Sequence, residues 1–144
     1  MTTFQYRSLV LVSLALCWTS GFLDQLVPGL LPEALKQAEV AAFAGQSPNW
    51  TMFVLVLAIA SVLSMLAATY GLLRFRPWAP KFAVLATGLV VVTSATIEAV
   101  AISGIAFSVH ALSWLCWGSA VLLSFTHPVK AWFVAEKRPD VVAA

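Results

Sequence analysis

Long apolar runs separated by short polar segments predict that this chain crosses a membrane four times. A helix needs about 20 mostly apolar residues to span the hydrocarbon core of a bilayer. Four stretches have this length and character, and they are residues 8–27, 51–73, 81–103 and 105–125. Because hydrocarbon cannot hydrogen-bond to the backbone, a segment that crosses it is expected to be an α-helix. The pattern predicts an all-α membrane protein, a single four-helix transmembrane bundle over residues 1–144.

A short amphipathic segment between the first two spans predicts a helix outside the bundle. It covers residues 31–44, with Pro32 suited to its first turn and Gly45 to the position after its end. Its apolar face is formed by Leu31, Leu35, Ala38 and Ala42. We expect this helix to lie as a lid on the bundle or in the outer headgroup layer.

The composition supports a membrane location. Of 144 residues, 61% are hydrophobic and 10% are charged, whereas a soluble domain has about 45–50% apolar and about 25% charged residues. These values exclude a soluble enzyme, a disordered tail and a nucleic-acid-binding domain, which would need a dense basic face. The first apolar run also resembles a signal peptide, but no A-x-A cleavage site follows it, so we interpret it as a retained helix.

The basic residues predict how the bundle is oriented. Only Lys36 lies on the outer side of the four-helix path, and the other seven share the opposite side: Arg7, Arg74, Arg76, Lys81, Lys130, Lys137 and Arg138. The positive-inside rule then predicts that both termini lie on the cytoplasmic side of the membrane, which we expect to be a bacterial inner membrane. In the cytoplasmic tail of residues 128–144, residues 129–137 predict an interfacial helix with Trp132 and Phe133 facing inward.

Glu98 is the one carboxylate in the spans whose position no boundary or loop explains. An ionisable group costs about 2.5–3.5 kcal/mol at a helix centre and indicates a functional site by default. A short turn at Ser103 and Gly104 would make the third and fourth helices antiparallel neighbours. Glu98 and His110 would then lie at equal depth, about 9 Å from that turn. Equal depth favours a contact between them, and the rotation of each helix decides whether it forms.

Asp24 and Ser94 are further candidates for handling a ligand or a proton. Ser94 shares a helical face with Glu98, and Asp24 shares one with small polar residues of the first helix. We expect Asp24, Glu98 and His110 to converge on a polar pocket that opens outward beneath the lid helix.

Structural interpretations of the same residues stay open. Hydroxylated residues at helical spacing also serve helix packing, Glu98 and His110 can form a structural link, and Asp24 lies near a helix end. No metal site or cofactor is predicted, because the few candidate ligands have no tight spacing. Cys17 and Cys116 are interpreted as small buried hydrophobes without a disulfide.

These patterns predict a small multi-pass inner-membrane protein that acts by binding a membrane partner or itself, in an accessory, scaffold or immunity-type role. The alternative is a small oligomeric transporter or channel in which Glu98 with His110 handles a proton or a cation. A membrane enzyme acting on lipid or quinone is a third interpretation.

In size and topology the chain resembles colicin-type immunity proteins. Its four helices and single membrane glutamate resemble small multidrug-resistance transporters, which carry that glutamate in the first helix instead of the third. The expected partners are the lipid bilayer and membrane proteins, not nucleic acid.

Overall fold

The computed structural model describes residues 1–27, 29–97 and 100–134, and these ranges are mostly helical and contain no strand. The elements are α1 (Thr3–Leu26), α2 (Glu33–Ala44), α3 (Pro48–Leu73), α4 (Ala79–Thr96), α5 (Gly104–Ser124) and α6 (Val129–Val134). Four of these helices, α1, α3, α4 and α5, are long and apolar enough to cross a membrane. The predicted all-α, four-helix membrane fold is confirmed.

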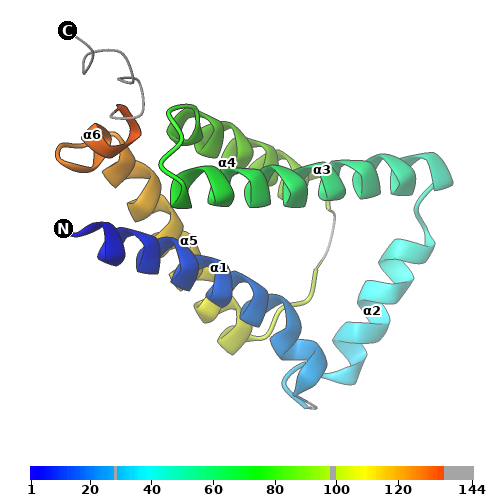
Figure 1. The fold of residues 1–144 in the computed structure, drawn as a ribbon. Helices are drawn as coiled ribbons and strands as arrows, with labels where there is room; N and C mark the ends of the chain where they lie inside the picture. Colours follow the sequence, from blue (N-terminus) through cyan, green and yellow to red (C-terminus); the bar gives the residue numbers. More distant parts are fainter. Residues whose placement is uncertain (28, 98–99, 135–144) are drawn as a thin grey trace, which may run out of the picture.

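The four spans are arranged as two helix pairs, which meet at one end and diverge toward the other (Figure 1). α5 packs along α1 and α4 packs along α3, whereas contacts between the two pairs are few. α2 joins the far ends of α1 and α3 and so bridges the open side (Figure 1). The third and fourth spans, predicted to be antiparallel neighbours, make few contacts with each other, and the main partner of α5 is α1.

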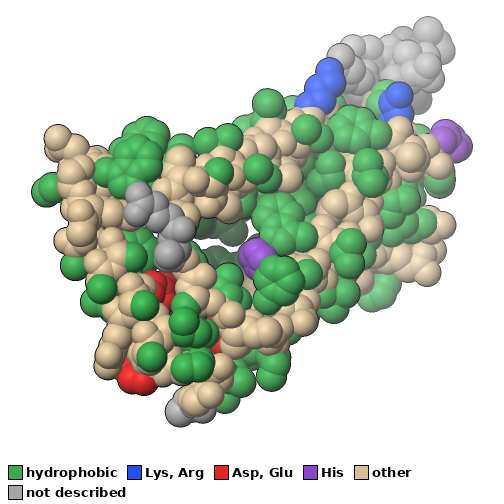
Figure 2. Space-filling view, turned by 180° about the vertical axis from the view of Figure 1, so that it is seen from behind, with side chains coloured by type: hydrophobic (Ala, Val, Ile, Leu, Met, Phe, Trp, Pro, Cys, Tyr) green, Lys and Arg blue, Asp and Glu red, His purple; other side chains and the backbone are tan. Residues whose placement is uncertain are grey.

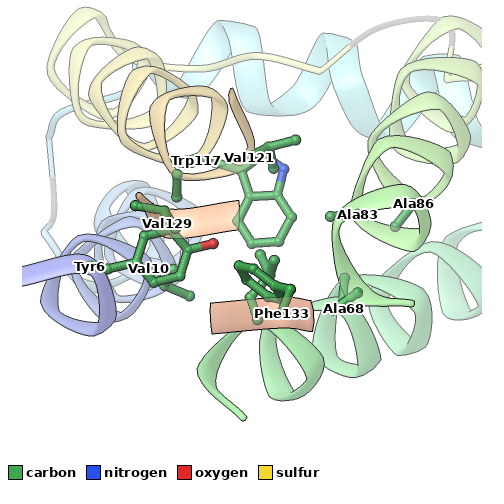
Figure 3. Close-up of a cluster of buried hydrophobic side chains, with 12 residues drawn as sticks. Tyr6, Val10, Ala68, Ala83, Ala86, Trp117, Val121, Val129 and Phe133 are labelled. Atoms are coloured by element: carbon green, nitrogen blue, oxygen red, sulfur yellow. The ribbon is translucent and has the colours of Figure 1, made fainter. Parts of the chain in front are cut away.

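The hydrophobic core lies where the two pairs meet. Figure 3 shows buried side chains from α1, α3, α4, α5 and α6 gathered there, among them Val10, Ala68, Ala83, Trp117 and Val129. The fully buried Tyr6 places its ring 5.8 to 6.2 Å from the rings of Phe75, Trp132 and Phe133. Ring pairs at such distances contribute about 0.5–1.5 kcal/mol each beyond their burial. These contacts anchor α6 to the start of α1 and to the α3–α4 turn.

Positive charge gathers at the same end as the core. Arg7 Nε donates a hydrogen bond to the Leu73 carbonyl at 3.1 Å, and its guanidinium lies 5.1 Å from the Phe75 ring centre. These contacts tie the start of α1 to the end of α3. Figure 2 shows lysine and arginine at this end of the molecule and aspartate and glutamate at the other. We call it the basic end, and its described cations are Arg7, Arg74, Arg76, Lys81 and Lys130.

The turn between α3 and α4 is a Schellman motif with an unusual residue. The Arg76 N–H donates to the Gly71 carbonyl at 2.9 Å, and the Phe75 N–H donates to the Leu72 carbonyl at 3.2 Å. Phe75 has a φ of 53°, a left-handed conformation that costs a residue with a Cβ atom about 1–2 kcal/mol. The contact of its ring with Tyr6 offsets this cost.

α4 ends at Thr96, not at residue 103 as the apolar run predicts, and Ile97 is extended. The hydroxyls of Thr93 and Thr96 donate to carbonyls one turn back, a pattern that competes with regular helix hydrogen bonding. Ser103 is the N-cap of α5, and its hydroxyl accepts a hydrogen bond from Ala106 N. An N-cap residue has non-helical backbone angles, so the chain has to leave the helix before this point. The predicted two-residue turn is therefore wrong.

The starts of other helices also differ by a few residues from the sequence pattern. α1 starts at Thr3 instead of residue 8, because Thr2 and Gln5 form a capping box. α2 starts at Glu33 instead of residue 31, directly after Pro32. α6 covers Val129–Val134, and the predicted continuation to residue 137 lies outside the described residues.

Candidate functional site

His110 of α5 lines two cavities, of which only the central one lies between the helix pairs. The central cavity has a volume of about 270 Å³ and takes its walls from all four spans. The α2 cavity, of about 450 Å³, lies between the end of α1, α2, residues 100–102 and the first part of α5. Figure 2 shows the hollow between the helix pairs, with a histidine side chain at its edge. Because His110 lines both cavities, it lies at the junction between them.

Both ring nitrogens of His110 are hydrogen-bonded, and their partners define its protonation. The Trp114 indole N–H donates to Nε2 at 2.8 Å. Since an indole can only donate, Nε2 carries a lone pair and the ring is neutral with its proton on Nδ1. Nδ1 lies 3.1 Å from Ser20 Oγ, and that hydroxyl donates its own proton to the Cys17 carbonyl. The chain of bonds runs from Trp114 through His110 and Ser20 to the α1 backbone.

The central cavity has apolar walls and polar groups that are mostly paired. No charged side chain occurs among its described lining residues, and its apolar part includes Leu14, Trp18, Val62, Met65, Leu66, Val90, Trp114 and Trp117. Ser113 donates to the Ser13 carbonyl at 2.8 Å and so links α5 to α1. The hydroxyls of Ser61 and Thr93, 2.6 Å apart, link α3 to α4. These bonds fasten each helix pair internally and leave the cavity walls little free hydrogen-bonding capacity.

One further hydrogen bond joins the two pairs beside this cavity. The Trp117 indole N–H of α5 donates to Thr87 Oγ1 of α4 at 2.9 Å, and Thr87 in turn donates to the Ala83 carbonyl. Trp117 is 4% exposed and belongs both to the core and to the cavity wall. The cavity is therefore closed toward the basic end by packed side chains.

Ser94 of α4 is the exception among the hydroxyls that line the central cavity. It has no hydrogen bond within the described part of the chain, whereas Ser13, Ser61, Thr69, Thr93 and Ser113 all have one. A serine in a span commonly bonds to a carbonyl of its own helix or to a neighbouring helix. Ser94 thus leaves a hydrogen-bonding group free beside the cavity.

Asp24, near the end of α1, caps α5. Its Oδ2 accepts a hydrogen bond from the Ser103 backbone N–H at 2.9 Å, and Ser103 is the N-cap of that helix. A carboxylate is favoured at a helix N-terminus because the backbone N–H groups there carry partial positive charge. Oδ1 of Asp24 is buried and has no hydrogen-bond partner in the described ranges. The contact fixes where the end of α1 meets the start of α5.

The α2 cavity is the polar one of the two. Its lining includes Asp24 and Gln25 from α1 and Lys36 and Glu39 from α2, together with His110. Lys36, the basic residue far from the basic end, therefore lines the same cavity as two carboxylates. The sequence pattern gave no reason to single out Lys36 or Glu39, because both are ordinary polar positions of an amphipathic helix.

The structure brings the predicted site residues together in two places. Asp24 and His110 line the α2 cavity, and Ser94 and His110 line the central cavity. Glu98 lies outside the described residues. The predicted equal depth of Glu98 and His110 assumed that the third span continues as a helix to the turn at Ser103 and Gly104, whereas α4 ends at Thr96. The described partners of His110 are instead Ser20 and Trp114.

The described residues contain no group of three or more His, Cys, Asp or Glu side chains that could hold a metal ion. Cys17 and Cys116 are both free thiols, and Cys17 lines the central cavity.

Comparison of the chain with protein-family models, with curated proteins and with solved structures finds no match.

Proposed function

We propose that this chain is a small membrane-embedded binding protein, which associates with a membrane partner or a second copy of itself in an accessory, scaffold or immunity-type role. The observation that carries the proposal is the surface of α2. This helix has no buried residue, and its side chains Leu35, Val40 and Phe43 are exposed. An isolated helix of 12 residues is marginal in water, and most helices depend on tertiary packing. An additional apolar surface from a partner would therefore stabilise α2.

The proposal also assigns the sides of the membrane. Lysine and arginine accumulate in short cytoplasmic loops. We therefore place the basic end on the cytoplasmic side of a bacterial inner membrane and α2 on the opposite side. A reporter enzyme that is active only in the cytoplasm, fused to the C-terminus, is expected to be active. An inactive but expressed fusion would contradict this orientation.

The association is tested by photo-cross-linking in native membranes, from a photoreactive amino acid at position 43 of the full chain. We expect a protein adduct of defined mass. The variant Val40→Glu places a charge among the exposed apolar side chains and should remove most of this adduct. The matched control Gln37→Glu adds the same charge at an exposed polar position of the same helix and should retain it.

The mass of the adduct identifies the partner. An adduct of two copies indicates self-association, and an adduct with another membrane protein indicates a hetero-partner. Cross-links to lipid alone, or a protein adduct equally strong in Val40→Glu and Gln37→Glu, would contradict partner binding through α2.

The alternative function is a small oligomeric transporter or channel in which Glu98 with His110 handles a proton or a cation. The position of His110 at the junction of the two cavities supports this candidate. In proteoliposomes, Glu98→Gln should then lower pH-dependent cation flux at least tenfold, while Glu33→Gln, on the exposed surface of α2, should not. A flux that Glu98→Gln leaves unchanged would rule this function out.

A further inference from the structure

We propose that the central cavity is a binding site for a neutral, lipid-soluble ring compound that carries one hydroxyl or carbonyl group. The site is distinct from the partner surface on α2, because it lies among the four spans on the other side of His110. Five properties of the cavity lead to this class of ligand: its size, its opening, the charge of its walls, its aromatic side chains and its one free hydroxyl.

The size and the opening of the cavity indicate a small molecule that enters from the bilayer. Sites for drug-sized ligands have volumes of about 300–1,000 Å³, and an apolar cavity of about 150 Å³ is able to hold benzene. At about 270 Å³, the central cavity suits a compound of one or two rings. Among its lining residues, Trp18, Val62 and Leu66 are 49%, 48% and 42% exposed on span helices. The cavity thus opens sideways, where lipid would surround the bundle.

The walls of the cavity select a neutral ligand. No charged side chain lines it in the described part of the chain, and Nε2 of His110, the histidine of the lining, accepts a hydrogen bond from the Trp114 indole. An ionised group moved into such surroundings loses its hydration and gains no counter-charge, which is strongly disfavoured. The cavity therefore favours a neutral ligand over an ion.

Aromatic side chains favour a flat ring as the occupant. Trp18 of α1 and Trp114 and Trp117 of α5 all contribute to the lining. Aromatic rings interact favourably in offset-stacked or edge-to-face arrangements, beyond the burial of their area. Two sulfur-containing side chains, Cys17 and Met65, add polarizable surface that also suits contact with rings.

The free hydroxyl of Ser94 is the reason that the ligand is expected to carry a polar group. The other serine and threonine hydroxyls of the lining are engaged within the protein, whereas the Ser94 hydroxyl has no bond within the described ranges. A hydroxyl is both a donor and an acceptor, so it can pair with either a hydroxyl or a carbonyl of the ligand. Ser94 is thereby assigned as the residue that orients the compound.

The test uses three related probes with the full-length protein in nanodiscs of neutral phospholipid. α-Naphthol is neutral and carries a hydroxyl, naphthalene lacks the hydroxyl, and naphthalenesulfonate carries a negative charge. Saturable quenching of tryptophan fluorescence, corrected for protein-free nanodiscs, reports binding. We expect α-naphthol to bind most tightly, naphthalene more weakly, and naphthalenesulfonate not to bind.

Ser94→Ala should weaken α-naphthol binding about three- to tenfold, which corresponds to one hydrogen bond, and leave naphthalene binding unchanged. The control Ser108→Ala lies outside the cavity lining and should change neither. Ala58 lines the cavity and Ala67 is an exposed residue of the same helix. Ala58→Phe should therefore abolish binding of both neutral probes, and Ala67→Phe should not.

Three results would overturn the proposal. They are α-naphthol quenching that does not saturate, naphthalenesulfonate binding as tightly as α-naphthol, and equal α-naphthol affinity in Ser94→Ala and the unmodified protein. The last result needs no cavity-filling variant, so the proposal stays testable if Ala58→Phe fails to fold. A failed cross-link from α2 would not contradict this proposal. The cross-linking experiment changes residues of α2 only, and the ligand-binding experiment changes none of them.

Discussion

Gly71 in the last turn of α3 provides a direct test of how closely α3 and α4 pack. A Cβ atom added at Gly71 would lie 2.7 Å from the Ala79 Cβ and 2.8 Å from Cη2 of Trp78. Both distances are shorter than carbon atoms tolerate, and Ala79 is fully buried at the start of α4. Gly71→Ala therefore forces the two helices apart, and overpacking of this kind costs about 1–3 kcal/mol.

The matched control for this substitution is Gly88→Ala in α4, where an added Cβ atom meets nothing within 4 Å. Both substitutions gain helix propensity, about 1 kcal/mol in water, so their difference isolates the steric cost. We expect Gly71→Ala to be less stable than Gly88→Ala by about 1–3 kcal/mol. The assay is reversible unfolding in mixed detergent–lipid micelles. Equal stability of the two variants would refute the close approach of α3 and α4 at the basic end.

Three other substitutions test single contacts. Trp114→Phe removes the donor to His110 Nε2 and should lower the free energy of unfolding by about 0.5–1.5 kcal/mol. Imidazole ¹⁵N NMR should report the Nδ1–H tautomer before the change and a mixture of tautomers after it. An unchanged spectrum would refute the assignment of the Nδ1–H tautomer. Asp24→Leu removes the acceptor for the Ser103 N–H and should destabilise by about 1–3 kcal/mol, clearly more than Asp24→Asn, which keeps a carbonyl oxygen; thermal unfolding in detergent compares the two. Phe75→Gly relieves about 1 kcal/mol of backbone cost but deletes a ring from the core, at about 3 kcal/mol. Thermal unfolding in detergent should therefore show a net loss of stability of about 2 kcal/mol. A gain in stability would contradict the packing of this ring.

The sequence predicted the spans well because long apolar runs in lipid have few alternatives to a helix. It predicted the lengths of the helices less well, because a run of apolar residues does not record where the backbone leaves the helix. α4 ends at Thr96 and Ser103 is the N-cap of α5, so the backbone leaves the helix inside an apolar run. An N-cap is a local hydrogen-bonding signal that hydropathy does not contain.

The partners of His110 among the described residues were not predicted from the sequence. Depth along a helix is a property of the sequence, whereas rotation and choice of neighbour depend on side-chain packing across the whole bundle. His110 therefore lies against Ser20 of α1, a residue 90 positions away. The sequence pattern had indicated Asp24 as a pocket or interfacial residue, and its role as the cap of α5 requires the tertiary contact with Ser103.

The central cavity and the exposed position of α2 both depend on the divergence of the two helix pairs. Pulsed electron paramagnetic resonance in nanodiscs measures it directly, with spin labels introduced in a background that lacks the two native cysteines. One label pair replaces Phe22 of α1 and Trp50 of α3 near α2, and the other replaces Phe4 of α1 and Tyr70 of α3 near the basic end. The structure predicts a longer distance for the pair near α2. Equal distances for both label pairs, or a shorter one near α2, would show that the helix pairs do not diverge.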